Sequence, residues 1–186
     1  VQTCALPIYK GKVAHHDSAG NSGIIGEGDV QWMTAASGVL HKEYHEKEFA
    51  KAGGIFSMVQ LWVNLPAADK LSKPKYQEIL NTNIPKVELP NNGGIVEVIA
   101  GNYEFNKGAA STFTEVNLFN VKLNAGGTAN FSFCDRNNTA ALVISGNIIV
   151  NGEHAVGTSH FALFSNDGEA FSISCEEEDR KSTRLN

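Results

Sequence analysis

The residues best suited to carry out chemistry are His41 and Glu43. They are separated by one residue at the end of GEGDVQWMTAASGVLHKE (Gly26–Glu43). Side chains two positions apart on a β-strand point to the same face of the sheet. An imidazole and a carboxylate on one face form half of a mixed nitrogen and oxygen ligand set for a transition metal. The alternative interpretation of the pair, taken alone, is a solvated strand end.

Strands and tight turns must position this pair. The pattern predicts strands over Tyr9–Asp17, Asp29–Thr34 and Val39–Glu43, with turns between them. The apolar run Ile55–Leu65 lies between a Gly-Gly pair and Pro66, and its β-branched and aromatic residues predict a buried central strand.

A second set of strands is predicted after Pro85. The expected bounds are Lys86–Leu89, Gly94–Ala100, Asn117–Leu123, Asn130–Cys134, Ala140–Ser145, Asn147–Asn151, Phe161–Ser165 and Ala170–Cys175. Turn sequences such as Asn166-Asp167-Gly168 separate them. Short strands at this spacing favour a barrel or jelly roll.

Longer strings resemble the pirin family. They are HHDSAGNSGIIGEGDVQWMTAASGVLHKE (His15–Glu43), QLWVNLPAADKLSKPKYQEI (Gln60–Ile79) and VIAGNYEFNKGAASTFTEVNLFNVKLNAGG, which begins at Val98. The order of Gly28, Trp32, Met33, Gly38 and His41 also resembles the second metal motif of a cupin barrel. The resemblance implies an all-β bicupin with two cupin or jelly-roll β-barrels, and we expect both barrels to be incomplete here.

The two ends of the chain do not resemble that family. Val1–Ile8 reads VQTCALPI, and Asp179–Asn186 reads DRKSTRLN. One permitted back-translation of the second is GATCGGAAGAGCACACGTCTGAAC, whose reverse complement encodes the first. We therefore interpret both ends as translated from the two strands of one DNA segment that resembles a sequencing-library adapter. Such ends are excluded from fold reasoning, as a tag would be.

The expected organisation has three native segments between the adapter-derived residues 1–8 and 179–186. Residues 9–65 are expected to form a partial N-terminal cupin domain that carries the metal site, and residues 66–83 a proline-containing linker. Residues 84–178 are expected to form a metal-free C-terminal cupin domain, because Asp135-Arg136-Asn137-Asn138 stands where a cupin would place its H-x-H.

The resemblance implies a four-ligand metal site. Pirins carry an H-P-H-R-G-F-E-T-V-T segment shortly before the strand that Tyr9 begins. It supplies two histidine ligands, and His41 and Glu43 supply the other two. That segment is absent here, and His15 and His16 are not substitutes because they fall on a later strand. We therefore expect half a site and an impaired fragment. The implied metal is Fe(II), although the donor types also suit Mn, Co, Ni, Cu or Zn.

The activity implied by the resemblance is that of a quercetin 2,3-dioxygenase, an oxidoreductase that opens a flavonol ring with dioxygen. Glu43 would be the catalytic base that takes the proton of the flavonol hydroxyl. The alternative is a metal- and redox-responsive regulatory protein, similar to a transcription cofactor, that binds a protein partner without turnover. A third interpretation is a cupin with another small-molecule specificity.

Several residues near the pair have two interpretations. Asp17 and Ser18 could orient a ligand histidine, but stabilisation of their own turn is the favoured interpretation. Trp32, Met33 and Phe56 could line an apolar pocket for a flat aromatic substrate, and ordinary barrel core is the favoured alternative.

Composition narrows the functional classes. The net charge of the chain is −5. Without the two ends, the chain loses three of its 15 basic residues and one of its 20 acidic residues, and the net charge becomes −7. This argues against direct binding to nucleic acid or to an anionic membrane. Outside the ends only Cys134 and Cys175 remain, which we expect to be buried thiols in a reducing cytoplasm. The sequence contains no run of about 18 apolar residues, so it predicts no membrane-spanning helix. We expect a cytoplasmic monomer.

Overall fold

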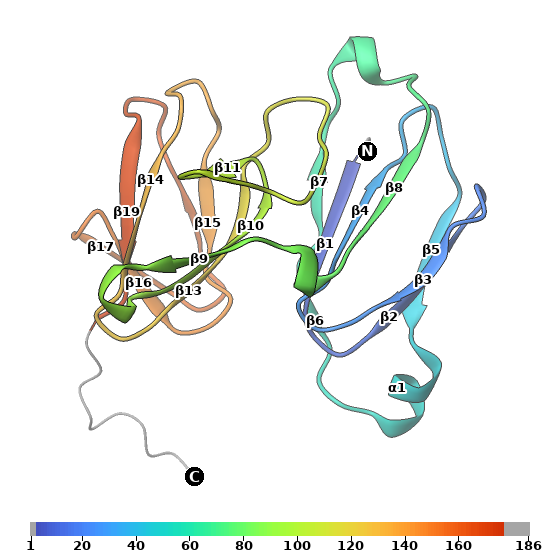
Figure 1. The fold of residues 1–186 in the computed structure, drawn as a ribbon, viewed down its shortest axis with the longest axis horizontal. Helices are drawn as coiled ribbons and strands as arrows, with labels where there is room; N and C mark the ends of the chain where they lie inside the picture. The colour runs from blue at the N-terminus through green and yellow to red at the C-terminus, as the bar shows by residue number, and fades with distance from the viewer. Residues whose placement is uncertain (1–2, 177–186) are drawn as a thin grey trace. The chain divides into compact units, whose positions relative to one another are not determined.

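The computed structural model describes residues 3–176 and divides the chain into two compact units (Figure 1). Among the described residues, the first unit comprises residues 3–85 and Val98–Leu118, and the second comprises Lys86–Glu97 and residues 119–176. Both are built from short β-strands, which confirms the predicted all-β class, and neither closes into a complete barrel in the part described. Between residues 3 and 176, no helix has the length and apolar character needed to cross a membrane.

One sheet of the first unit is built around β1 (Thr3–Lys10). β4 (Val30–Thr34) pairs with one edge of β1, and β8 (Lys75–Ile79) continues the sheet beyond β4. The short strands β6 (Ser57–Met58) and β7 (Leu61–Val63) pair with the other edge. All of these pairs are antiparallel, and β1 is an interior strand because it has partners on both edges.

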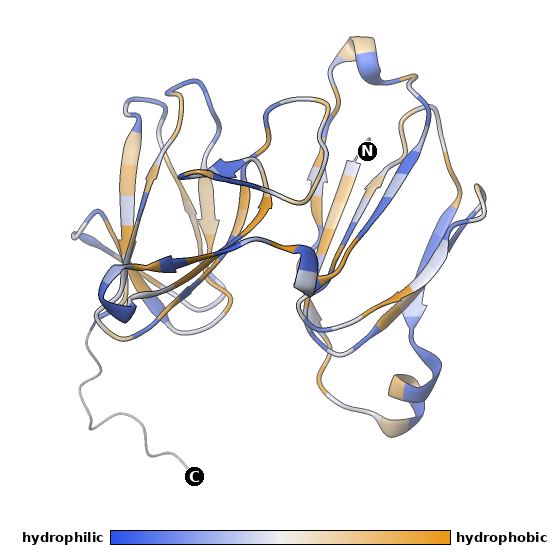
Figure 2. Ribbon diagram, in the orientation of Figure 1, coloured by the Kyte–Doolittle hydropathy of each residue, from blue (hydrophilic) through white to orange (hydrophobic). Residues whose placement is uncertain are grey.

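The segment that we interpret as adapter-derived contributes to this interior strand. Thr3–Ile8 are all buried, and this part of β1 is mostly hydrophobic (Figure 2). Pro7 pairs with Val30 in the middle of the sheet. Proline is rare at such positions because it has no N–H to donate to the ladder. An apolar sequence can therefore occupy the strand, although Pro7 fits it poorly.

A second sheet of the first unit carries the predicted histidines. It consists of β3 (Ser22–Ile25), β2 (Val13–Asp17) and β5 (His41–His45), in that order. β5, which is largely hydrophilic, leads into α1 (Lys47–Ala52), in which hydrophilic and hydrophobic residues are mixed (Figure 2). Glu46 begins the helix because its carboxylate accepts the first free N–H groups. The unit also contains the strands β11 (Asn102–Tyr103) and β12 (Asn106–Lys107) and the 3-10 helices η1 (Ala67–Asp69) and η2 (Asn81–Asn83).

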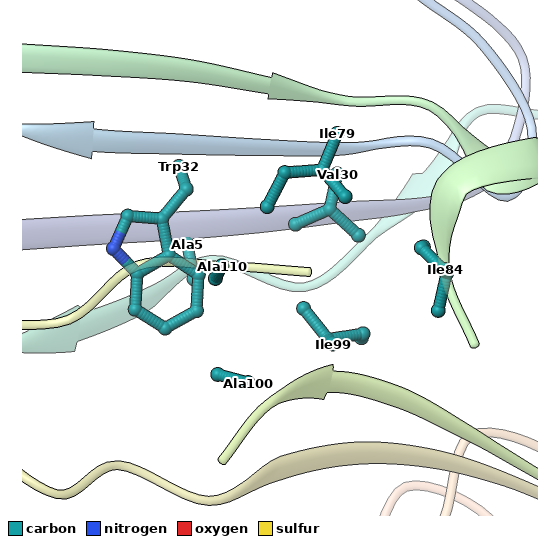
Figure 3. Packing of buried hydrophobic residues seen from close by; sticks show 8 residues of the cluster. All are labelled: Ala5, Val30, Trp32, Ile79, Ile84, Ile99, Ala100 and Ala110. Carbon is teal, nitrogen blue, oxygen red and sulfur yellow. The ribbon is translucent and has the colours of Figure 1, made fainter. Parts of the chain in front are cut away.

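Strand alternation gives the first unit two apolar clusters. Val30 and Trp32 point to one face of β4, and Trp32 is 1% exposed. They pack in a cluster with Ala5, Ile79, Ile84, Ile99, Ala100 and Ala110 (Figure 3). The second cluster, Leu6, Ile8, Val13 and Ile25 with Phe56 against it, joins residues of β1, β2 and β3. Burying a large aromatic side chain such as Trp32 contributes roughly 2–3 kcal/mol.

Two predictions for the middle of the chain need correction. Ile55–Leu65 is not one buried strand: it contains only β6 and β7, and Ile55 and Trp62 are largely exposed. These strands lie at the edge of the sheet. One of their faces and the unpaired backbone groups along their outer edge are open to solvent. Residues 66–83, predicted as a linker, contain β8, which pairs with β4 from Val30↔Ile79 to Thr34↔Lys75. The segment therefore belongs to the first unit, which continues to Pro85 before the second unit begins at Lys86.

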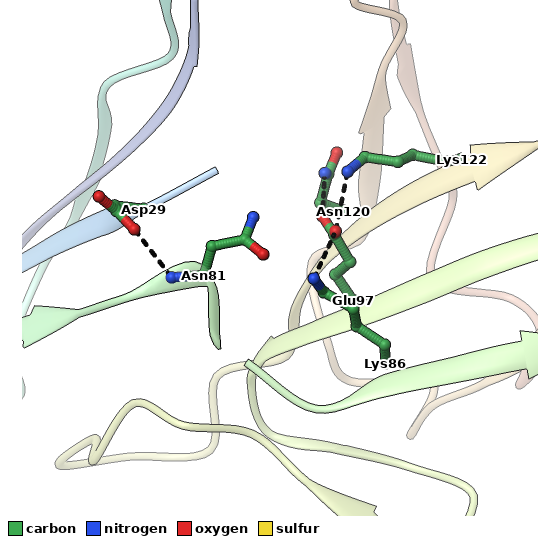
Figure 4. A network of polar contacts seen from close by, with 6 residues as sticks. All are labelled: Asp29, Asn81, Lys86, Glu97, Asn120 and Lys122. Atoms are coloured by element: carbon green, nitrogen blue, oxygen red, sulfur yellow. Dashed lines mark hydrogen bonds and ion pairs between the residues drawn. The ribbon is translucent and has the colours of Figure 1, made fainter. Parts of the chain in front are cut away.

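The turn before β4 is fixed by a close approach. The Asp29 carboxylate accepts the Asn81 N–H at 2.8 Å (Figure 4). Gly28 has φ +84, and a Cβ there would lie 1.8 Å from the Asn81 side-chain nitrogen. Only glycine fits this position, which explains the first glycine of the cupin-like motif.

The second unit follows the predicted strand pattern closely. Its strands are β9 (Lys86–Leu89), β10 (Gly94–Ala100, whose last three residues belong to the first unit), β13 (Leu118–Leu123, whose first residue belongs to the first unit), β14 (Thr128–Ser132), β15 (Ala140–Leu142), β16 (Asn147–Val150), β17 (His154–Gly157), β18 (Phe161–Leu163) and β19 (Ala170–Ser174). The 3-10 helix η3 (Pro90–Asn92) joins β9 to β10. The strands pair in the orders β13-β10-β9, β14-β19-β16-β17 and β15-β18. The sequence analysis missed β17, and in the first unit β3, β8, β11 and β12.

A buried carboxylate stabilises one sheet of the second unit. Glu97 accepts hydrogen bonds from Asn120 at 2.5 Å and Lys122 at 2.8 Å, and Lys86 approaches to 4.0 Å (Figure 4). These partners compensate the charge that β10 buries.

The two cysteines of the second unit differ from the prediction that both are buried. Cys134 is exposed, and Cys175 is half-buried.

Candidate metal centre

The site begins with the pairing of β2 and β5. His15 lies opposite Glu43, and Asp17 lies opposite His41. Opposite residues of an antiparallel pair share a face, so these four side chains point to the same side of the sheet. His15 and Asp17 are buried, whereas His16, one residue out of phase, is exposed. The inner face of this sheet therefore carries imidazoles and carboxylates.

His41 and Glu43 converge. His41 Nε2 lies 3.0 Å from Glu43 Oε1, and the two side chains are 14% and 20% exposed. The side-chain nitrogen of Gln31, from β4 of the other sheet, donates to Glu43 Oε1 at 2.5 Å and lies 3.3 Å from His41 Nε2. The Gln31 amide nitrogen thus faces two acceptor atoms. They are Glu43 Oε1 and, in the tautomer that leaves it unprotonated, His41 Nε2. This is the arrangement that a cation also requires.

The pair fits a transition metal as part of a ligand set. Two ligand atoms each about 2.1 Å from an ion and at right angles to one another are roughly 3 Å apart. The separation of His41 Nε2 and Glu43 Oε1 matches that value. However, no group of three or more His, Cys, Asp and Glu side chains in residues 3–176 is arranged to hold a metal ion. These two residues can supply a nitrogen and an oxygen ligand, and further ligands have to come from elsewhere.

His15 lies beside the pair without joining it. Its ring is stacked on Tyr76 of β8 with a centroid distance of 4.4 Å, and it lies 5.9 Å from the ring of His41. Burial lowers the pKa of His15, and the nearby His41 lowers it further, so the neutral imidazole is favoured. Burial likewise raises the pKa of Tyr76. The sequence analysis kept His15 out of the ligand set, and the structure places it in the site but outside ligand distance of the pair.

Unpartnered polar atoms gather at this site. In the described part of the chain, the buried side-chain nitrogen and oxygen atoms without a hydrogen-bond partner are both ring nitrogens of His15, Gln31 Oε1, His41 Nδ1 and Tyr76 Oη. All of them belong to these four neighbouring residues. More than nine in ten buried polar groups in proteins have a partner, so such a concentration marks a place that a ligand, an ion or water completes.

Asp17 and Ser18 stabilise the turn that follows β2. The Asp17 carboxylate accepts the backbone N–H groups of Ala19 and Asn21 at 2.9 Å and the Asn21 side-chain amide at 2.7 Å. Burial raises the pKa of Asp17, but these hydrogen bonds outweigh it and hold the pKa below its usual value. Ser18 Oγ accepts the Leu40 N–H at 3.0 Å. The favoured interpretation of these two residues, turn stabilisation, thus agrees with their contacts.

The three apolar residues near the motif do not share a pocket. Trp32 lies in the first apolar cluster, on the face of β4 away from Gln31. Phe56 packs against the second cluster. Met33 is the one that shares the site-facing side of β4 with Gln31, because the two are two residues apart.

Sequence reasoning missed two residues of the site. Gln31 is fully buried between the apolar Val30 and Trp32, and Tyr76 lies on the strand hidden in the predicted linker. The one available signal was a polar residue inside an apolar strand, since such a residue points to the opposite face from its neighbours.

An all-β fold in which an imidazole and a carboxylate converge between two sheets defines a cupin-type protein. The sequence profile of the Pirin family matches residues 3–63. Residues 3–63 therefore match the pirin family, and the relatives below are similar to this chain over most of its length.

Individual relatives agree with this assignment. A Pseudomonas aeruginosa protein provisionally named quercetin 2,3-dioxygenase PA2418 is 45% identical over 160 residues, which cover 86% of this chain and 56% of that protein. The crystal structure of quercetin 2,3-dioxygenase from Acinetobacter baumannii is 42% identical with a TM-score of 0.89, covering 95% of this chain and 61% of that one. The chain therefore spans little more than half the length of these relatives.

A more distant structure shares the fold. It is the bacterial pirin YhhW from Escherichia coli in complex with nickel(II), which is 18% identical with a TM-score of 0.73. The match covers 95% of this chain and 69% of that one.

Proposed function

We propose that this chain is part of a metal-dependent dioxygenase of the pirin type that acts on a flavonol such as quercetin. The observation that carries the proposal is the 3.0 Å approach of His41 Nε2 and Glu43 Oε1. It is supported by relatives whose names include quercetin 2,3-dioxygenase. His41 and Glu43 would be two of four ligands, and the other two would be the histidines of the family segment expected before Tyr9.

The metal would supply Lewis acidity and the coordination of dioxygen. The chain's own residues would bind and orient the substrate. Glu43 would accept the proton of the flavonol hydroxyl, which leaves the substrate as an oxyanion. Gln31 would hold the Glu43 carboxylate through its 2.5 Å hydrogen bond, so that the second carboxylate oxygen stays available.

Iron is the metal we propose first, as Fe(II). A nitrogen and oxygen donor set is also suited to Mn, Co, Ni, Cu and Zn. The nickel(II) complex of an Escherichia coli pirin supports a site that admits more than one divalent metal. Geometry at the pair alone does not select among them.

The test compares this chain with a restored protein. In the restored protein, a family-type H-P-H-R-G-F-E-T-V-T segment replaces Val1–Ile8, and a family-type C-terminus replaces Asp179–Asn186. Dioxygen uptake is measured with quercetin after loading with Fe(II). We expect uptake in the restored protein, and little or none in this chain or in the restored protein with His41→Ala.

The matched control is His16→Ala in the restored protein, because His16 lies on the same sheet but faces outward. It should take up dioxygen like the unsubstituted protein. Metal binding without dioxygen uptake would contradict the dioxygenase and favour a regulatory protein that binds a partner. Equal uptake with His41→Ala would contradict the assignment of the site.

A further inference from the structure

We propose that His15, Tyr76 and Gln31 form a hydrogen-bonding subsite for a planar aromatic ligand that carries hydroxyl groups, beside the pair His41 and Glu43. This inference rests on the proposed function and adds to it the residues that select the substrate. It assigns Tyr76 and His15 the role of binding a ligand hydroxyl, which is distinct from binding metal.

The first argument is burial without partners. His15 is 1% exposed, and neither of its ring nitrogens has a hydrogen-bond partner in the described part of the protein. The Tyr76 hydroxyl and Gln31 Oε1 are buried and unpartnered in the same way. A buried donor or acceptor that is left unsatisfied destabilises the fold, because it has lost its hydrogen bonds to water and gained none in return. A fold that keeps several of them in one place is expected to gain this free energy back when something binds there.

The second argument is the chemistry of the unpartnered atoms. A neutral imidazole offers one donor and one acceptor, and a tyrosine hydroxyl offers both. Gln31 Oε1 is a carbonyl oxygen and only accepts, and the Gln31 amide nitrogen already donates to Glu43. The complementary ligand must therefore both donate and accept. A hydroxyl group does so, whereas a carboxylate only accepts and an ammonium group only donates.

The third argument is the aromatic and sulfur surface around the subsite. Trp62 pairs with Cys4, Cys4 with Met33, and Met33 with Tyr76 across four adjacent strands. Directly opposed residues share a face, so these four side chains form a row on the side of the sheet that also carries Gln31. Trp62 is 65% exposed at the edge of this row. A planar ring bound at Tyr76 would extend along Met33 toward Trp62.

The orientation of His15 is held by its neighbours. The His15 ring stacks on Tyr76 with an interplanar angle of 21°. A Cβ on Gly23 would lie 3.0 Å from His15 Nε2 and from a Glu78 carboxylate oxygen, so a side chain at this position would crowd this nitrogen. His15 and Tyr76 therefore present their polar atoms from a fixed pair of rings.

The experiment measures ligand binding to the metal-free 186-residue chain, with tryptophan fluorescence and calorimetry. The probes are quercetin and unsubstituted flavone, which share a ring system but differ in hydroxyl groups. Tyr76→Phe removes one hydroxyl and keeps the ring that stacks on His15. We expect Tyr76→Phe to raise the Kd for quercetin about 5- to 10-fold, the loss of one hydrogen bond, and to leave the Kd for flavone within about twofold.

Tyr44→Phe is the matched control, because Tyr44 is an exposed tyrosine of the same unit and should not change either Kd. Circular dichroism and Tm establish that each variant folds. The same fold-change for quercetin and flavone would overturn the subsite, because it would show a change in shape. No binding of quercetin to the folded chain would also overturn it and leave these atoms to water.

Failure here is distinguishable from failure of the proposed function. Binding is measured without metal or turnover, so a Tyr76-dependent preference for quercetin would stand even if the restored protein took up no dioxygen. Conversely, dioxygen uptake by the restored protein together with unchanged quercetin binding in Tyr76→Phe would uphold the function and reject this subsite.

Discussion

The first unit buries nitrogen and oxygen atoms between its sheets, whereas the second unit gathers phenylalanine rings. In the first unit, the buried imidazole of His15 and the amide of Gln31 lie beside the pair His41 and Glu43. In the second, the ring centroids of five phenylalanines lie 4.3–6.2 Å from their neighbours, and the rings are Phe119, Phe131, Phe133, Phe164 and Phe171.

This difference supports the proposal that the first unit binds a ligand, whereas the phenylalanine rings of the second unit form a packed core. Unpartnered buried polar groups reduce the stability of a fold, whereas packed aromatic rings increase it by area burial and by about 0.5–1.5 kcal/mol per pair beyond that. Similar strand arrangements can therefore serve binding or stability according to which residues point inward. The predictions below test the contrast, beginning with the largest expected effect.

The phenylalanine cluster should dominate the stability of the second unit. Phe131 is buried and its ring lies 5.1 Å from that of Phe171. Phe131→Ala removes this ring from the core, and we expect a loss of about 3–5 kcal/mol in the free energy of unfolding. Urea denaturation followed by circular dichroism measures it. Phe161→Ala is the control, because Phe161 is 61% exposed, and a loss as large there would contradict a role for the cluster.

In the first unit, stability should depend on a carboxylate instead of an aromatic ring. Asp17→Ala removes three hydrogen bonds to a charged acceptor, and we expect a loss of about 2–3 kcal/mol at neutral pH. Thermal denaturation measures it, with the exposed Asp135→Ala as a control that should change stability by less than about 0.5 kcal/mol.

The same carboxylate predicts a pH dependence. The folded pKa of Asp17 is lower than its unfolded value of about 3.9, so its contribution is fully present above that value. The contribution is lost as the pH falls below about 4 and through the folded pKa. The difference in stability between the unsubstituted chain and Asp17→Ala should therefore shrink on acidification. A difference that grows toward low pH would contradict this sign.

The smallest effect concerns the residue that holds Glu43. Gln31→Leu keeps the side chain large but removes the 2.5 Å hydrogen bond to the carboxylate. In the restored protein we expect the affinity for Fe(II) to fall about 10-fold, at the low end of the range for residues that orient ligands. Competition with a chelator measures it. Gln77→Leu is the matched control, because Gln77 bonds to Ser111 on the other face of the same sheet. Equal loss in both variants would assign the effect to packing.

Sequence reasoning predicted the strands of the second unit other than β17, because turn residues separate them, as at Lys86–Leu89 and Gly94–Ala100. It also placed His41 and Glu43 on one face, since that needs only the two-residue period of a strand. Sequence reasoning did not predict β8, because the prolines on both sides of this segment suggested a linker. The pairing of β8 with β4, more than 40 residues earlier in the chain, also leaves no local signal in the sequence. Tyr76 enters the site only through that pairing, and Gln31 enters it through its contact with Glu43 of the other sheet.

The most direct test of the contrast is the metal content of the restored protein, measured by mass spectrometry after Fe(II) loading and desalting. The account predicts about one metal per chain in the unsubstituted protein and in His16→Ala, and a small fraction of that in His41→Ala and Glu43→Ala. The 186-residue chain itself, with half of the expected ligands, should retain little metal. Stoichiometric metal in His41→Ala and Glu43→Ala would contradict the account, because the first unit would then bind its metal without the two residues on which it rests.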